Sequence, residues 1–388
     1  MDFSLNQDQT DIKSAVAELC THYPDLYWRE LDKTHSYPDT FVKALTEAGW
    51  LAVLIPPEYD GAGLGITEAA IVLEEINHAG GNAATAHAQM YTMGTVLRYG
   101  NDQQKKKYLP AIAGGELRLQ AFGVTEPNAG SETTRIETRA IKKGDTYVVN
   151  GHKIFISRAE HSDLLLLLAR TTAYDELEDK SRGLSVFLVD LQEAQARGQI
   201  QVNPLQVMIN HHTTELVIQD LEVPAENLIG QEGMGFRYII DSWNPERILV
   251  ASESLGDGHW FVERASTYAS ERVVFGRPIG ANQGVQFPIA KAYASLEAAA
   301  LMRYKAAWLF DSGQKCGFEA NAAKMLASQA SWDAANACLD THGGYGFAVE
   351  YDIERKFRET RLYQTAPISN NMVLNFIGQN VLGMPRSY

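Results

Sequence analysis

Apolar residues recur at every third or fourth position through the first part of the chain, up to about residue 118, and this spacing predicts amphipathic helices. It is clearest in the segments TFVKALTEAGWLAVL and ITEAAIVLEEINHA. A loop is expected between them, because prolines and glycines cluster there. Farther along, NDQQKKKYLPAIAGGE predicts a helix that is capped at Asn101 and ends at a glycine pair.

The pattern changes between about Leu119 and Gly230, where short runs of β-branched and aromatic residues alternate with turn residues. The runs include TYVVNGHKIFIS, LLLLLAR, LSVFLVD and ELVIQDLEVP, and they predict a compact β domain. After Gly235 the helical spacing returns, and YASLEAAALMRYKAAWLF is typical of a long bundle helix. We therefore expect three domains: a helical domain over 1–118, a β domain over 119–230 and a helical bundle over 231–388.

Composition narrows the class of protein. The chain has 388 residues, enough for two or three domains, and its 45% hydrophobic and 21% charged residues are ordinary for a soluble globular protein. It has no apolar run of the roughly 18 residues that a membrane span requires. The opening MDFSLNQDQTD lacks the features of a secretory signal, and the scattered Cys20, Cys316 and Cys338 indicate no disulfide framework. We expect a cytoplasmic protein, and a net charge of −14 argues against nucleic acid as the main partner.

The segment AFGVTEPNAGSETTRI, at the entry to the β domain, is the most informative stretch for chemistry. It combines hydroxyl side chains, small residues and glycine in an apolar setting. Such a loop can bring backbone N–H groups and hydroxyls close to a planar heterocycle. The same composition also suits a capped β-turn with no ligand.

Four blocks of sequence decide between these alternatives. GVTEPNAGSE resembles the first signature of the acyl-CoA dehydrogenase family, and NGHKIFIS resembles its second, with Phe155 where tryptophan is usual. ERVVFGRPIGANQ and THGGYGF, the latter followed by ERKFRETRLYQ, resemble two later family blocks. All four occur in the family's order and spacing over essentially the whole chain. The resemblance implies an α+β fold of acyl-CoA dehydrogenase type, with an N-terminal helical domain, a central β-barrel domain and a C-terminal four-helix bundle.

The resemblance also implies an FAD cofactor and assigns residues to it. Hydroxyl and backbone donors at Thr125 and Ser157 would meet the polar edge of the flavin and stabilise charge on its reduced form. Residues from a neighbouring subunit would complete the site, which implies a homotetramer built as a dimer of dimers. Asp340 stands where the family usually has glutamine. The full set of implied cofactor residues is Phe122, Val124, Thr125, Gly130, Ser131, Phe155, Ile156, Ser157, Arg272, Phe275, Gln283, Asp340, Gly343, Gly344, Ser369 and Asn371.

The substrate implied by the resemblance is an acyl-CoA thioester. The residues expected to contact it are Ser131, Ser181, Arg182, Asn244 and Arg247. Arg182, in ELEDKSRG, is equally natural as a solvated loop charge. The identity of the acyl chain, and the choice between coenzyme A and an acyl-carrier protein, stay open.

The reaction needs a carboxylate base for the substrate's α proton, and a desolvated one works best because its pKa is raised towards the working pH. Many family members carry this glutamate near the C-terminus, but Ala366–Ser369 occupies that place here and contains no carboxylate. The resemblance also implies a backbone N–H at this position that polarises the thioester carbonyl, and Pro367 has no N–H. A second branch of the family carries the base in an earlier Glu-Arg pair. That pair is Glu246-Arg247, and we expect Glu246 to be the base, with Pro245 in the first turn of its helix. The alternative is a surface ion on an amphipathic helix.

Other residues bear on the substrate without deciding it. Arg158 either recognises a substrate carboxylate or pairs with Glu160 or Asp163. Met90 and Met93 either line the acyl pocket or belong to a core stripe. His211 and His212 lack further ligands in motif spacing, so no metal is expected.

The function implied by the resemblance is α,β-dehydrogenation of an acyl-CoA in fatty acid metabolism. Glu246 removes the α proton while a hydride passes from the β carbon to flavin N5, which gives the trans-2-enoyl-CoA. Electron-transferring flavoprotein is the implied electron acceptor. Two alternatives stay open: a flavin monooxygenase or oxidase on the same scaffold, and a non-catalytic FAD-bearing assembly protein.

Overall fold

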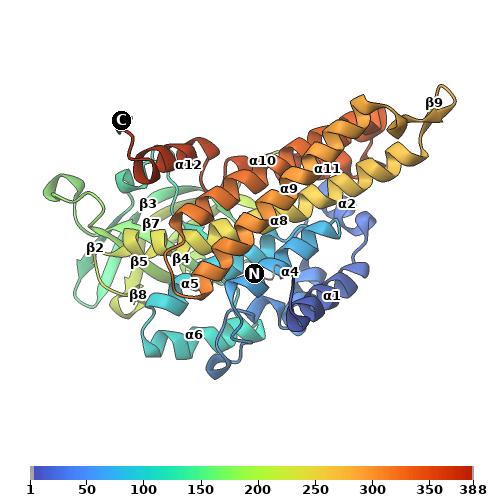
Figure 1. The fold of residues 1–388 in the computed structure, drawn as a ribbon. Coiled ribbons are helices and arrows are strands. Elements are labelled where there is room, and N and C mark those ends of the chain that lie inside the picture. The colour runs from blue at the N-terminus through green and yellow to red at the C-terminus, as the bar shows by residue number, and fades with distance from the viewer. Residues whose placement is uncertain (1–3, 387–388) are drawn as a thin grey trace. The chain divides into compact units, whose positions relative to one another are not determined.

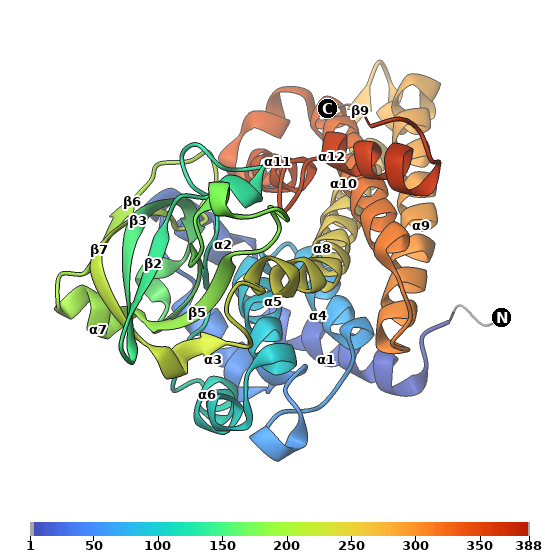
Figure 2. The same ribbon diagram turned by 90° about the vertical axis from the view of Figure 1, so that its left-hand side faces the viewer.

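The segments expected to be strands between residues 119 and 230 form one sheet in the computed structural model, which describes residues 4–386 (Figures 1 and 2). β1 pairs in parallel with β4, and most other neighbours are antiparallel. The order across the sheet is β6 (Ile200–Pro204), β7 (Thr213–Pro224), β3 (Thr146–Ser157), β2 (Arg139–Lys143), β4 (Leu164–Arg170), β5 (Leu184–Asp190) and β8 (Leu228–Ile229), with β1 (Ala121–Gly123) beside β4.

Strand β4 has the sequence LLLLLAR and is buried along its whole length. Successive side chains point to opposite faces of a strand. Accordingly Leu164 and Leu166 pack with the helices α5 (Ala84–Tyr99) and α6 (Asp102–Gly114), and Leu165 and Leu167 pack with β3, β6 and β7. The leucines pack β4 on both faces of the sheet, and β4 is the strand that pairs with β1.

The helix expected at Asn101 is confirmed as α6. The Asn101 side chain accepts the N–H of Gln104 at 2.9 Å, and the Gln104 side chain accepts the N–H of Asn101 at 2.9 Å. The helix ends at Gly115, which has φ +79°, a conformation that glycine adopts at little cost. The same unit contains α3 (Asp39–Glu47) and α7 (Leu191–Ala196).

The chain folds into two units. We call residues 37–63 and 84–243 the β unit, and residues 4–36, 64–83 and 244–386 the helical unit. The helices of the first 118 residues are divided between them, and the three domain boundaries stay a prediction. The helical unit contains α1 (Gln7–Thr21), α2 (Asp25–Thr34), α4 (Ile66–His78), α9 (Gln283–Asp311), α10 (Gly317–His342), α11 (Ile353–Arg361) and α12 (Asn370–Phe376), with the hairpin of β9 (Val273–Val274) and β10 (Arg277–Pro278).

Helix α8 runs from Gly235 to Glu271, so the expectation that Pro245 lies in a first turn is wrong. Phe236, Ile239 and Trp243 continue the helical apolar spacing upstream, and the proline removes only one backbone hydrogen bond. Within the helical unit, a Cβ atom at Gly258 would lie 2.3 Å from Leu296 Cδ2 on α9. The two helices can therefore approach this closely only at a glycine.

Buried charges tie α8, α11 and the glycines that follow α4 together in the helical unit. Lys356 forms an ion pair with Asp257 and donates to the carbonyl oxygen of Gly81 at 2.8 Å. Arg355 donates to Glu359 and, at 3.0 Å, to the carbonyl oxygen of Gly80. Among residues 4–386 no helix is both long and apolar enough to cross a membrane.

Candidate active site

The two segments expected to hold the flavin lie side by side in the β unit. The N–H of Ile154 donates to the carbonyl oxygen of Thr125 at 3.0 Å, which joins the turn after β1 to the end of β3. Val124 and Thr125 therefore come close to the segment Phe155–Ser157, as the sequence predicts. Phe122 lies on β1, with its ring 5.9 Å from that of Tyr91.

A buried ion pair holds this turn. Lys153 Nζ donates to Glu126 Oε1 at 2.8 Å and to the carbonyl oxygen of Val124 at 3.0 Å. Glu126 also accepts the N–H groups of Glu137 at 2.6 Å and Thr138 at 2.9 Å. Burial alone would raise the pKa of Glu126, but the Lys153 charge and these N–H groups outweigh it and lower the pKa. Sequence reasoning missed this role for Glu126, although a glutamate and a lysine inside two signature blocks were a visible signal.

Phe155 has backbone φ +58° and is 61% exposed. A bulky residue in the left-handed region is uncommon and costs free energy, and such strain is concentrated at functional sites. Ile156, next along the chain, is buried, and its carbonyl oxygen accepts the hydroxyl of Thr214 at 2.8 Å. The end of β3 therefore presents an exposed aromatic ring beside a fixed strand.

Three of the residues expected to contact the acyl-CoA, Ser131, Ser181 and Arg182, lie in loops of the β unit, whereas Asn244 and Arg247 lie on α8. Ser181 donates its hydroxyl to Asp179 Oδ1 at 2.6 Å, and Arg182 lies 3.7 Å from the same carboxylate. Gly130 and Ser131 are exposed as well. Arg182 is thus a solvated loop charge in this structure, and its role towards a ligand stays a prediction.

A cavity of about 570 Å³ in the helical unit brings together four of the residues expected to bind FAD. Arg272, Asp340, Gly343 and Gly344 all line it, together with Tyr345 and other residues from the ends of α8 and α10. Residues from two separate sequence blocks therefore come together at one place, and their role in binding FAD stays a prediction. Gln283 begins α9.

The cavity suits the phosphate-bearing part of a dinucleotide. A Cβ atom built on Gly343 or Gly344 would meet nothing within 4 Å, so the backbone there is open to close approach by a ligand. Arg272 supplies a permanent cation, which binds phosphate through paired N–H groups. Phe275, at the tip of the β9–β10 hairpin, is fully exposed with φ +52°. These residues fit the cofactor that the sequence predicts.

Glu246 and Arg247 are both buried on α8, with 7% and 8% of their surface exposed. The alternative that Glu246 is a surface ion is therefore excluded. Arg247 donates to Asn244 Oδ1 at 3.2 Å. Burial lowers the pKa of Arg247, and the charge of neighbouring Glu246 opposes that shift. The helix thus holds a glutamate and an arginine together away from bulk water.

Arg158 is buried and donates to Nδ1 of His211 at 3.2 Å, and its backbone N–H donates to the carbonyl oxygen of His212 at 2.7 Å. The side chain of Arg158 thus contacts a histidine, and the choice between a substrate carboxylate and an ion pair with Glu160 or Asp163 stays open. Met93 packs in the core of the β unit, which supports a core stripe on α5.

Comparison with known proteins decides the family. The family models for the N-terminal, middle and C-terminal domains of acyl-CoA dehydrogenases match residues 6–116, 121–221 and 233–382. The chain belongs to the acyl-CoA dehydrogenase family. This membership confirms the resemblance and the three-part fold class predicted from the sequence, makes the chain an oxidoreductase, and implies a flavin cofactor.

Individual relatives match along almost the whole length. The acyl-CoA dehydrogenase fadE12 of Mycobacterium bovis is 33% identical over 391 residues, which cover 100% of this chain and 99% of the relative. A glutaryl-coenzyme A dehydrogenase solved with glutaryl-CoA is 31% identical, with a TM-score of 0.91 and coverage of 100% and 98%. Butyryl-CoA dehydrogenase from Megasphaera elsdenii is 28% identical, with a TM-score of 0.91 and coverage of 98% and 100%.

This acyl-CoA dehydrogenase departs from the family pattern at Ala366–Ser369, and a buried lysine organises that segment. Lys324 Nζ donates to the carbonyl oxygen of Ile368 at 2.6 Å and to Asn370 Oδ1 at 3.0 Å. Burial and the charge of Arg247 lower the pKa of Lys324 to about 7. Ser369 caps α12, and Asn371 is exposed. Sequence reasoning missed Lys324, whose signal was a single charge in the apolar run NAAKMLASQAS.

Proposed function

We propose that the chain catalyses the FAD-dependent α,β-dehydrogenation of an acyl-CoA thioester to the trans-2-enoyl-CoA. The observation that carries the proposal is the burial of Glu246 beside Arg247 on α8. The place where many family members have their base holds Ala366–Ser369 instead, which contains no carboxylate. Membership of the family supplies the reaction class.

Glu246 is the proposed base for the α proton. A carboxylate held away from bulk water loses its hydration shell, so it is a stronger acceptor for a weakly acidic C–H proton. Arg247 keeps a positive charge close to the glutamate. Asn244, which accepts a hydrogen bond from Arg247, fixes the orientation of that cation.

Two groups of residues are proposed to hold FAD. In the β unit these are the turn after β1 and the end of β3, held together by the bond from Ile154 to Thr125 and by the ion pair of Glu126 and Lys153. In the helical unit they are the residues of the cavity around Arg272 and Gly343, with Phe275 and Gln283 offered to a neighbouring subunit. Bound FAD supplies the acceptor for the hydride that leaves the β carbon.

We propose the homotetramer that the family resemblance implies, and the outer surface of α9 supports a protein interface. Phe287, Leu301 and Trp308 are 57%, 51% and 60% exposed, and they lie seven or fourteen positions apart on one helix face. Such a row of large apolar side chains on a surface indicates a protein interface. We also propose electron-transferring flavoprotein as the acceptor and a cytoplasmic location, in keeping with the free, buried cysteines Cys20, Cys316 and Cys338.

Product analysis under anaerobic conditions, with a parallel reaction in air, tests this function. The purified flavoprotein is incubated with straight, branched and carboxylated acyl-CoAs and an artificial electron acceptor, and the thioesters are analysed by mass spectrometry. The proposal predicts a product that has lost two hydrogen atoms, without any need for oxygen. A product that has gained an oxygen atom, and only in air, would establish the monooxygenase alternative. No conversion of any thioester would favour the assembly protein.

A further inference from the structure

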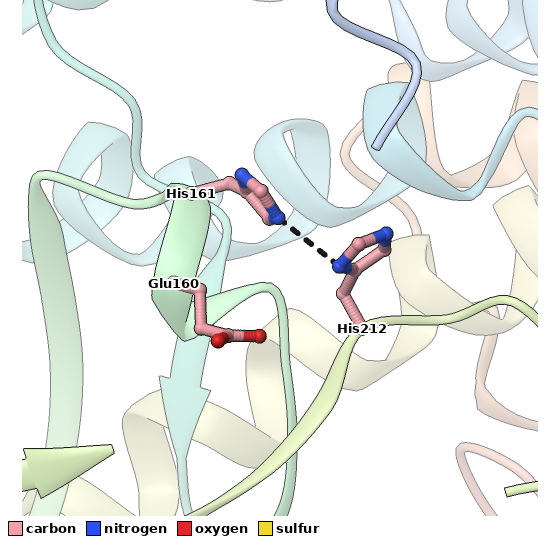
Figure 3. Close-up of side chains that lie close together, drawn as sticks. All are labelled: Glu160, His161 and His212. Carbon is pink, nitrogen blue, oxygen red and sulfur yellow. Dashed lines mark hydrogen bonds between the residues drawn. The ribbon is translucent and has the colours of Figure 1, made fainter. Parts of the chain in front are cut away.

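Three side chains in the β unit bring metal-binding atoms together. One ligand atom from each of Glu160, His161 and His212 lies within 4.8 Å of the other two (Figure 3). Nε2 of His161 and Nδ1 of His212 are 3.0 Å apart. Figure 3 shows Glu160 and His161 on one short helical turn and His212 on a separate segment that approaches them.

The two imidazoles are fixed by their surroundings. The ring of His161 stacks on that of Tyr37, with centroids 4.1 Å apart and an interplanar angle of 15°. The ring of His212 stands nearly perpendicular to both. Tyr37 is itself held by a hydrogen bond from its hydroxyl to Gln120 at 2.8 Å. Ligands that cannot turn away lose little conformational entropy when they bind an ion.

The charge state of the cluster suits a cation. An imidazole nitrogen that carries no proton keeps a lone pair that can bind a metal ion. The carboxylate of Glu160 adds a negative ligand, while the guanidinium of Arg158 is directed at Nδ1 of His211.

We propose that Glu160, His161 and His212 form a binding site for a divalent transition-metal ion of the zinc type, with water as the fourth ligand. Two imidazole nitrogens and one carboxylate oxygen are a ligand set that Zn²⁺ and Co²⁺ accept, whereas Mg²⁺ and Ca²⁺ prefer oxygen alone. Nitrogen ligands about 2.0–2.1 Å from a tetrahedral Zn²⁺ lie roughly 3.4 Å from each other, close to the separation seen between the two imidazoles. Sequence spacing cannot show this site, because the two histidines are 51 positions apart.

The ion has a mechanical effect on the β unit. It replaces the single hydrogen bond between His161 and His212 with two metal bonds. His212 already accepts the N–H of Arg158 through its carbonyl oxygen at 2.7 Å. An ion therefore clamps the segment before β7 to the residues that follow β3, and ligand-bound protein gains stability by mass action.

The test measures Zn²⁺ binding to the full-length, untagged flavoprotein after treatment with a chelator. Equilibrium dialysis with zinc chloride gives stoichiometry and affinity, and Co²⁺ added alone gives visible absorption that reports coordination number. The variants are His161→Gln, His212→Gln and Glu160→Gln. The control is His152→Gln, because His152 forms a pair with Glu215 at 2.5 Å on the same sheet but belongs to no three-ligand cluster described between residues 4 and 386.

We expect one Zn²⁺ per chain in the wild type and in the His152→Gln control. Each ligand variant should weaken binding at least ~10-fold, since the loss of even an outer contact to a metal ligand costs that much. Tetrahedral cobalt bands should disappear in His161→Gln and in His212→Gln. Two results overturn the proposal: a wild type that binds no Zn²⁺ at 100-fold excess, or ligand variants that bind Zn²⁺ as tightly as the His152→Gln control does. Circular dichroism and flavin content of each variant establish that it is folded.

Discussion

Glu126 in the β unit and Glu246 in the helical unit are both buried glutamates next to a cationic side chain, and we propose different roles for them. Glu126 is 6% exposed, and its carboxylate oxygens accept hydrogen bonds from Lys153 and from two backbone N–H groups. Glu246 is 7% exposed and its neighbour Arg247 donates to a side-chain amide. Burial and a nearby cation are thus shared by both, and neither feature alone identifies a base.

The carboxylate of Glu126 accepts two backbone N–H groups in addition to the lysine. A carboxylate that accepts several N–H donors is stabilised in its charged form, and the pKa of Glu126 is accordingly lowered. Such a group is a poor proton acceptor and a good structural anchor. Glu126 anchors the turn that the proposed flavin residues occupy, and Glu246 is left as the proposed base. Variants of the two glutamates and of Lys153 test this division, and variants of His78 and Arg182 extend the comparison to other charges of the two units, from the largest expected effect to the smallest.

The substitution Glu246→Gln should lower kcat for acyl-CoA oxidation by about 10²–10⁴-fold, because that is what a general base typically contributes. Folding and flavin content should stay as in the wild type. The measurement is steady-state turnover per bound flavin. Glu126→Gln is the matched control: it should lose flavin and thermal stability, while the fraction that keeps flavin turns over normally. Equal losses of turnover per flavin in both variants would remove the distinction between the two glutamates.

The substitution Lys153→Met should destabilise the β unit by about 3–5 kcal/mol, because it leaves the buried charge of Glu126 without its partner. Denaturant unfolding followed by fluorescence measures the change. The double variant Glu126→Gln with Lys153→Met should recover part of the loss, since no unpaired charge remains. Lys143→Met, on the exposed part of β2, should have little effect. If Lys153→Met unfolds like Lys143→Met, the ion pair does not anchor the turn.

The wild-type protein should lose stability as the pH rises above neutrality, because a charged histidine in the helical unit loses its proton. The substitution His78→Gln should remove most of this dependence. His78 lies between Glu75 and Glu263, and these carboxylates raise its pKa from 6.5 to about 9 in spite of burial. Because the pKa is higher in the folded state, the stabilisation is fully present below pH 6.5 and is lost as the pH rises through about 9. It amounts to about 1–2 kcal/mol after allowance for screening.

Thermal unfolding between pH 6 and pH 9.5 measures this dependence. The His78→Gln variant should show a flatter profile than the wild type. His22→Gln, at an exposed histidine of the same unit, should keep the wild-type slope. Identical slopes in the wild type and in His78→Gln would show that the histidine carries no such charge.

The substitution Arg182→Ala should change stability by less than about 1 kcal/mol, because an exposed ion pair such as the one with Asp179 contributes little. If Arg182 meets coenzyme A, KM should rise about 10-fold while kcat is unchanged, as expected for loss of one hydrogen bond to a charged group. Arg197→Ala, which removes an exposed ion pair with Glu193 in the same unit, is the control. An unchanged KM would leave Arg182 as a surface charge only.

Sequence alone predicted the parts of the molecule whose information is local. Runs of leucine and of β-branched residues predicted the strands, and Asn101 and the glycine pair predicted the ends of α6. The signature blocks predicted that Thr125 lies close to the end of β3. It failed where the decisive partner lies far along the chain. Lys324 and Ile368 are 44 positions apart, and His161 and His212 are 51 apart, so no spacing rule connects them. Pro245 misled because proline favours a first turn, whereas upstream apolar residues extended α8 past it.

The most direct test of the central claim is an anaerobic titration of the purified flavoprotein with a panel of acyl-CoAs, monitored by flavin absorbance, for the wild type and for Glu246→Gln. We predict that at least one acyl-CoA class bleaches the wild-type flavin and that the same class leaves the flavin of Glu246→Gln oxidised. Bleaching of both proteins at the same rate would contradict the role of Glu246. A wild-type flavin that no acyl-CoA bleaches would contradict the proposed reaction itself.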